Sequence, residues 1–156
     1  MARQRNLTFA ESVRATPDVQ NCYQEGLRAI LERERSKIVL LDTRACEGSV
    51  YIDACTTAQY PNDNRWDYCF SYKGEVFFVE VHTANSSEVS TVIRKLLWLK
   101  NWLNSHAPEI NKLKAKSVTP YYWIQSSGYH IPPRSRQYRE ADRAGILPVP
   151  RLELKH

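Results

Sequence analysis

The clearest hydrophobic pattern in the chain is a pair of neighbouring apolar segments joined by a tight turn. Val76 to Val79 are consecutive apolar residues, which is typical of a strand buried on both faces. Trp66 to Tyr72 is rich in aromatic residues and also favours a strand, and Lys73-Gly74 between the two segments suits a hairpin turn. The pattern therefore predicts a β-hairpin whose second strand runs from Val76 to Val81.

Two longer segments show the spacing of a helix with one buried face. In residues 87–104 the apolar positions are Val89, Val92, Ile93, Leu96, Leu99 and Leu103. Asn85 precedes this segment with Glu88 three residues later, which is the arrangement of a capping box. A second helix is predicted over residues 17–35, with Thr16 as its N-cap and an apolar stripe formed by Cys22, Leu27, Ile30 and Leu31.

Shorter elements surround these segments. Apolar alternation and turn residues predict further strands at residues 50–54, 121–125 and 146–149, the second of them ending before Gly128. Short helices are expected over residues 8–14 and 135–144, whereas Ile38 to Leu41 fits either a helix extension or a strand. The order α–β–β–β–α–β–α–β predicts one α/β domain over residues 1–156, with a mixed sheet of four to five strands flanked by helices.

The chain is basic, with a formal net charge of +5 and an isoelectric point near 9.1. This balance suits a polyanionic partner such as DNA or RNA, with an ordinary solvated surface as the alternative. Basic residues gather in the C-terminal half, where they can bind phosphates without reading base sequence: Lys112, Lys114, Lys116, Arg134, Arg136, Arg139 and Arg143.

Met1 to Asn6 is polar and basic and leads into no apolar run of signal-peptide length. No stretch approaches the roughly 20 apolar residues that span a bilayer. We therefore expect a cytoplasmic protein with no membrane partner, whose cysteines stay reduced. A zinc site built from Cys55, Cys69 and His82 lacks the paired spacing of such sites, so buried structural thiols are the preferred interpretation.

Candidate chemistry centres on two carboxylates of the predicted hairpin. Antiparallel pairing about Lys73-Gly74 places Asp67 opposite a residue near Glu80, so the two side chains can face one another. An oxygen-rich pair of this kind suits a hard divalent ion such as Mg²⁺. The alternative is that both carboxylates only satisfy nearby backbone or a basic residue. Glu80 interrupts a buried apolar run, however, and a buried carboxylate needs a cation, a metal or a proton.

Trp66-Asp67-Tyr68, Gly74 and Phe78-Val79-Glu80-Val81-His82, followed by a capped amphipathic helix, resemble the core of the PD-(D/E)XK nucleases. In that restriction-endonuclease-like superfamily, an Asp on the second core strand and an E-x-K motif on the third bind one or two metal ions, and the Lys assists the attacking water. The resemblance covers roughly residues 17–126, and the element order agrees with it. It implies a restriction-endonuclease-like core, Mg²⁺ or Mn²⁺ as cofactor, and Asp67 and Glu80 as metal ligands.

The chain departs from this motif because His82 stands where the family has Lys. Three accounts stay open. His82 serves as base or ligand near neutral pH, or a lysine from elsewhere reaches the site, or catalysis has been lost while the fold is kept. Lys95 is the best candidate for a substituting lysine, since it flanks the apolar face of the helix predicted over residues 87–104.

Several further residues are weaker candidates. Glu25 on the helix predicted over residues 17–35 is a possible extra metal ligand, and Asp53 is a reserve for the acidic cluster. Gln125, at the end of the strand predicted over residues 121–125, and Arg94, on the helix predicted over residues 87–104, are candidate substrate contacts. Trp98 and Trp102 lie four residues apart beside Arg94 and Lys95, an arrangement that suits stacked bases. Ordinary packing or a homodimer face is the preferred interpretation of this pair.

These observations lead to a primary hypothesis, a metal-dependent nuclease acting on DNA or RNA. The alternative is a catalytically inactive nuclease-fold module that binds nucleic acid or a protein partner. Resemblance of fold alone does not decide between them.

Overall fold

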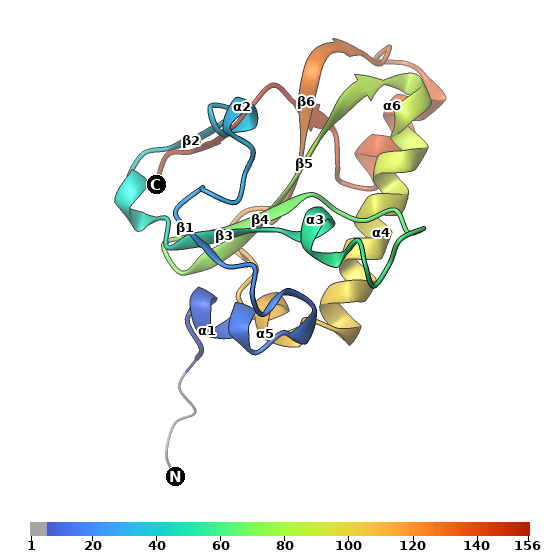
Figure 1. Ribbon diagram of the computed structural model, residues 1–156. Helices are drawn as coiled ribbons and strands as arrows, with labels where there is room; N and C mark the ends of the chain where they lie inside the picture. Colours follow the sequence, from blue (N-terminus) through green and yellow to red (C-terminus); the bar gives the residue numbers. More distant parts are fainter. Residues whose placement is uncertain (1–5) are drawn as a thin grey trace.

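The computed structural model describes residues 6–156, so the expectation about Met1 to Asn6 falls almost wholly outside the described residues. Within residues 6–156, six strands form a mixed central sheet (Figure 1), in the order β1 (Gln24–Glu25), β3 (Gly48–Tyr51), β4 (Tyr68–Tyr72), β5 (Glu75–Asn85), β6 (Tyr121–His130) and β7 (Pro148–Val149). Neighbours from β1 to β5 are antiparallel, whereas β6 runs parallel to both β5 and β7. The fold is therefore α/β, and its sheet is wider than the four to five strands expected.

The predicted hairpin forms at the centre of this sheet, but β4 begins two residues later than expected, at Tyr68, and β5 continues four residues further, to Asn85. Lys73 and Gly74 make the turn with φ values of 50° and 80°, the left-handed conformation that two-residue hairpin turns require. Along β5 the apolar residues alternate between two cores: Val76 and Phe78 pack on one face of the sheet, Phe77 and Val79 on the other. Burial on both faces explains why this strand reads as a continuous apolar run.

Helix α4 (Val89–Ser105) carries the chain from β5 to the parallel strand β6 and packs against one face of the sheet (Figure 1). Parallel neighbours need such a crossover connection. The shorter helices are α1 (Phe9–Arg14), α2 (Glu32–Arg35), α3 (Ile52–Thr56), α5 (Pro108–Asn111) and α6 (Arg136–Arg143), with 3₁₀ turns η1 (Pro17–Val19), η2 (Thr43–Ala45) and η3 (Ser86–Glu88). A parallel pair of strands, β2 (Ile38–Leu40) and β8 (Leu152–Leu154), covers the other face of the sheet.

The helix predicted over residues 17–35 is wrong. This segment contains only η1, the short strand β1 and the single-turn helix α2. Its apolar residues serve opposite faces of the sheet, since Val19 belongs to the core beneath α4 and Ile30 to the core beneath β2 and β8. One straight helix cannot reach both cores, and Gly26 at φ +54° supports a turn between them.

Smaller corrections concern where elements end. The strand predicted over residues 50–54 stops at Tyr51, and Ile52 opens α3, while β6 continues through Gly128 to His130. Ile38–Leu40 is a strand because the C-terminal strand β8, which the pattern did not predict, pairs with it. Asn85 makes no side-chain cap, so the expected capping box is absent. Among the described residues, no helix combines the length and apolar character that crossing a membrane requires.

Cys22 and Cys55 form a disulfide with a Cα–Cα distance of 6.4 Å, so the expectation of reduced thiols is wrong for this pair. The spacing of 33 residues concealed it, because the contact depends on the turn after η1 lying beside α3. Cys46 and Cys69 are the buried free thiols that the sequence led us to expect.

We expect the disulfide to stabilise the fold by restricting the unfolded chain. For a closed loop of this length the chain-entropy estimate is about 3 to 4 kcal/mol. The double variant Cys22→Ser/Cys55→Ser should lose stability of this order in urea unfolding monitored by circular dichroism, and wild-type protein under reducing conditions should match it. Equal unfolding midpoints in oxidising and reducing buffer would contradict a bridge between these residues.

Candidate active site

Asp67 and Glu80 lie directly across from each other at the start of β4, the end away from the hairpin turn. Tyr68 pairs with Val79, so Asp67, one residue before β4, is opposite Glu80 in the continued register. The side chains hold each other's strands: the backbone N–H of Asp67 donates to Glu80 Oε1 at 3.0 Å, and that of Val81 donates to Asp67 Oδ2 at 3.0 Å. The two carboxylates thus replace ladder hydrogen bonds at this point of the sheet.

Both carboxylates face the side of the sheet that α4 covers. Cys69 and Phe78, which flank them two residues away on their strands, pack into the core shared with α4. Because residues two apart on a strand share a face, Asp67 and Glu80 point the same way. The Glu80 side chain is 1% exposed, whereas Asp67 is half-buried and gives the site its access to water.

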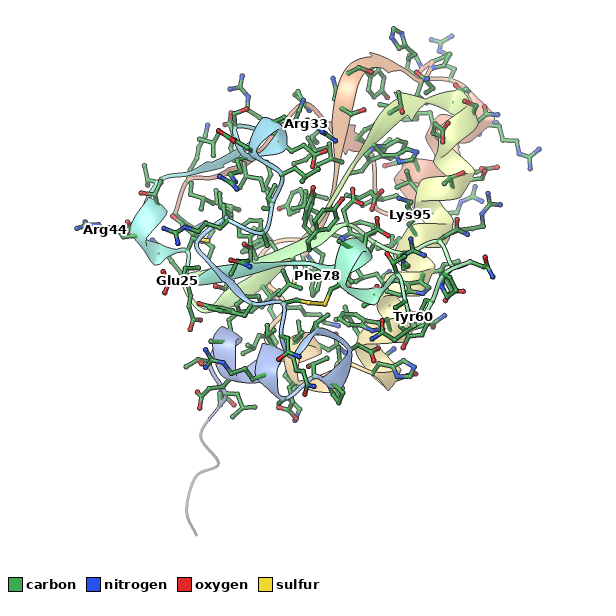
Figure 2. The ribbon with its side chains drawn as sticks, in the orientation of Figure 1. Glu25, Arg33, Arg44, Tyr60, Phe78 and Lys95 are labelled. Atoms are coloured by element: carbon green, nitrogen blue, oxygen red, sulfur yellow. A yellow bond between two sulfur atoms is a disulfide. The ribbon has the colours of Figure 1, made fainter. Side chains whose placement is uncertain are left out.

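Lys95 reaches this pair from α4. Its Nζ lies 2.6 Å from Glu80 Oε2, and its side chain is 17% exposed. Val92, Leu96 and Leu99 bury the apolar face of the helix against the sheet, which brings the neighbouring position 95 to the edge of that face. Figure 2 shows Lys95 on the side of α4 that faces the strands. Helix α4 therefore places a lysine beside the buried carboxylate of Glu80.

His82 lies between two carboxylates. Its Nε2 is 2.9 Å from Glu88 Oε2 and its Nδ1 is 3.6 Å from Glu80 Oε2, so Glu88 is the closer partner. Trp123 supports this position from β6, because its indole N–H donates to the His82 carbonyl at 3.1 Å. Glu88 and Trp123 were not singled out as site residues from the sequence. Glu88 was assigned to a helix cap, and only the distance to His82 reveals its other role.

Burial and charge alter the proton affinities at this site. Desolvation, with the neighbouring Glu80 carboxylate, raises the pKa of Asp67 to about 8, although Lys95 and the Val81 N–H oppose the change. Burial by itself lowers the pKa of Lys95, but its charge and hydrogen-bond contacts with Glu80 raise it overall. Contact with Glu80 also raises the pKa of His82; burial opposes this and Glu88 adds to it.

The other sequence candidates lie at varying distances from this cluster. Glu25 is an exposed residue of β1, and Figure 2 places it on the far side of the molecule from Lys95, so it is no ligand of this site. The backbone of Asp53 lies next to Asp67, because the Asp53 N–H donates to the Asp67 carbonyl at 3.2 Å. The Asp53 carboxylate, however, pairs with Arg65 at 2.7 Å. Gln125 is registered beside His82 on β6, and its carbonyl accepts from Lys37 Nζ at 3.2 Å.

Arg94 precedes Lys95 on α4 but is exposed, with its guanidinium 3.4 Å from Thr91 Oγ1. The imagined zinc site does not form, since Cys55 is in the disulfide and Cys69 is fully buried. Across residues 6–156 no group of three or more His, Cys, Asp or Glu side chains is placed to hold a metal ion. The largest cavity described, about 910 Å³, lies beside α1 and residues 109–116 and is not lined by Asp67 or Glu80.

The donor set nevertheless fits a magnesium-type ion. Mg²⁺ is usually held by one or two carboxylates and completes its shell with water and substrate phosphates, so a protein cage of three ligands is not needed. Each ionised carboxylate accepts several hydrogen bonds or ligands, so the bonds from Asp67 N, Val81 N and Lys95 leave acceptor capacity on both groups. Half-buried Asp67 offers the approach from water.

Comparison of the chain with models of known protein families, with curated proteins and with solved structures gave no match.

We expect Asp67→Asn to stabilise the protein at alkaline pH. The folded state holds the pKa of Asp67 near 8 against an ordinary value of 3.8, so folding takes up a proton between these values and stability falls as pH rises through them. The variant should equal wild type below about pH 4 and exceed it by roughly 1 kcal/mol or more above pH 8. Urea unfolding across this range tests the prediction, with exposed Asp142→Asn as control; a difference independent of pH would contradict it.

We expect Glu88→Gln to lower the pKa of His82. The Glu88 carboxylate, 2.9 Å from the imidazole, favours its charged form, and its loss should therefore lower the pKa of His82. NMR titration of the imidazole protons measures this directly. Glu140→Gln, which removes a half-buried carboxylate paired with Arg136 on α6, is the matched control and should leave the His82 titration unchanged.

Proposed function

We propose that this protein is a metal-dependent nuclease that hydrolyses phosphodiester bonds of DNA or RNA at Asp67, Glu80 and Lys95. The observation that carries the proposal is the contact of 2.6 Å between Lys95 Nζ and the buried Glu80 carboxylate, beside the half-buried carboxylate of Asp67. Two carboxylates and a lysine are the set of groups used by the PD-(D/E)XK nucleases that the sequence resembles. The lysine would come from α4 instead of the third strand.

The arrangement of the elements supports the same proposal. Strands β3, β4 and β5 form an antiparallel meander, α4 follows, and β6 returns parallel to β5. This is the order β–β–β–α–β expected of a restriction-endonuclease-like core, and we propose that the chain shares that core. The formal net charge of +5 favours association with a polyanionic substrate.

The roles of the side chains follow from their positions. Asp67 and Glu80 would hold Mg²⁺ or Mn²⁺, which when bound polarises a phosphodiester and lowers the pKa of a coordinated water. Lys95 carries a fixed positive charge at the mouth of the site and can donate to the attacking water or to a phosphate oxygen. His82 and Glu88 act as positioning residues, because Glu88 holds the imidazole at 2.9 Å and the imidazole lies 3.6 Å from Glu80 Oε2.

A second candidate function is a nuclease-fold module that binds nucleic acid or a protein without cutting. The contacts of Glu80 favour it, since one oxygen accepts from Asp67 N and the other from Lys95, which already compensates the buried charge. A metal ion would have to share Glu80 with this lysine.

Cleavage of labelled single- and double-stranded DNA and RNA, with Mg²⁺, Mn²⁺ or EDTA, separates the two functions. We expect metal-dependent cleavage that falls by about 10²-fold or more in Asp67→Asn, Glu80→Gln and Lys95→Gln. Lys100→Gln is the matched control, since it removes a charge from the exposed side of the same helix, where Lys100 contacts Tyr121.

Equal loss of activity in Lys95→Gln and Lys100→Gln would show that only the overall charge of α4 matters and would remove the assigned role of Lys95. Absence of cleavage in all conditions by folded protein, together with retained binding to one of the nucleic acids, would establish the binding module instead.

A further inference from the structure

The two tryptophans of α4 have different environments, which the sequence pattern did not distinguish. Their rings stack at a centroid distance of 5.8 Å and an angle of 9°. Trp102 is 2% exposed and donates its indole N–H to Asp18 at 3.0 Å, so it belongs to the core. Trp98 is only half-buried and donates to Asp63 Oδ2 at 3.0 Å. Ordinary core packing therefore accounts for the position of Trp102, but it does not account for the partly exposed ring of Trp98.

Trp98 is held rigidly at the surface. Trp102 covers one ring face, Tyr60 meets it edge-on at 5.7 Å and 78°, and Asp63 fixes its N–H. In Figure 2 Tyr60 lies beside α4 on the same side of the molecule as Lys95. Trp102 lies one turn further along the helix, so the opposite ring face is directed toward the turn that contains Arg94.

A cavity of about 370 Å³ lies at this position, between α4 and the loop that precedes Trp66. Its walls combine one aromatic ring, one exposed aliphatic side chain, a guanidinium, amide groups and the carboxylate that holds the Trp98 N–H: Trp98, Leu97, Arg94, Asn62, Asn64, Asn101 and Asp63. Amides both donate and accept hydrogen bonds, as the edge of a nucleobase requires. The face of the indole ring can stack on any of the bases, because each of them has a flat π-face.

Both walls of the cavity lie close in sequence to residues of the candidate active site, although Asp67, Glu80 and Lys95 do not line it. Trp98 lies three residues after Lys95 on α4, which places their side chains about one helical turn apart. The opposite wall, residues 62–64, leads through Arg65 and Trp66 directly into Asp67. A base bound at Trp98 would therefore lie about one helical turn from Lys95, which contacts Glu80.

We propose that this cavity binds an unpaired nucleobase stacked on Trp98, with Arg94 on the adjoining phosphate, so that the substrate is single-stranded nucleic acid. The inference rests on the proposed function for its polynucleotide ligand. A base within a duplex cannot enter, because both of its faces are already stacked and its pairing edge is occupied. Arg94 was a candidate substrate contact from the sequence, and in this proposal the group that it contacts is the phosphate next to the stacked base.

The test is binding of short fluorescent oligonucleotides in EDTA, measured by anisotropy, which does not depend on cleavage. Single strands should bind more tightly than the same sequences as blunt duplexes. Trp98→Leu should weaken single-strand binding about 10-fold or more, as expected for the loss of one stacked base, whereas Trp98→Phe should retain most of it. The melting temperature of each variant establishes that it is folded.

The outcomes keep the two proposals apart. Single-strand binding that requires Trp98 in a protein that never cleaves supports this inference and rejects the nuclease. Cleavage whose KM and strand preference are unchanged in folded Trp98→Leu supports the nuclease and overturns the inference. No binding of any oligonucleotide, with self-association that Trp98→Leu abolishes, would overturn it as well and assign the surface to a homodimer.

Discussion

The buried carboxylate of Glu80 is the group around which this part of the structure is arranged. An ionised carboxylate that is removed from water must be paired and hydrogen-bonded, and removing one partner of such a pair costs about 3 to 5 kcal/mol. Here Lys95 supplies the charge and the backbone N–H of Asp67 supplies the second hydrogen bond. The start of β4, the middle of β5 and the middle of α4 are thereby tied to one side chain.

Stability alone does not account for this arrangement, because buried ion pairs often contribute no more to the free energy of folding than apolar packing would. Desolvation and a second carboxylate raise the pKa of Asp67 to about 8, and perturbation of this kind is common at functional sites. The rest of β5 illustrates the contrast, since Phe77, Phe78 and Val79 pack fully apolar on both faces of the sheet. Asp67, Glu80, His82 and Lys95 lie where the fully buried part of β5 gives way to half-buried residues.

Under the two proposals, chemistry and recognition would lie on neighbouring sides of one helix. The side of α4 that faces the sheet brings Lys95 to the carboxylates, and the neighbouring side presents Trp98 and Arg94 to a cavity closed by the loop before Trp66. A rigid helix fixes the distance between the two, which a pair of loops would not. The disulfide between Cys22 and Cys55 anchors α3, from which that loop departs.

Several features follow from the sequence alone because they depend on local periodicity. The hairpin, the amphipathic helix α4 and the opposition of Asp67 and Glu80 depend on alternation, helical spacing and a two-residue turn, and Lys95 could be named from its helical phase. Tertiary structure decided the rest. The segment 17–35 is not a helix because Val19 and Ile30 pack into cores on opposite sides of the sheet. The Cys22–Cys55 bridge, the pairing of β2 with β8, the contact of Glu88 with His82 and the different environments of Trp98 and Trp102 join residues whose proximity no local pattern encodes. Such contacts exist only once the chain has closed long loops, so their partners cannot be read from residues near them in sequence.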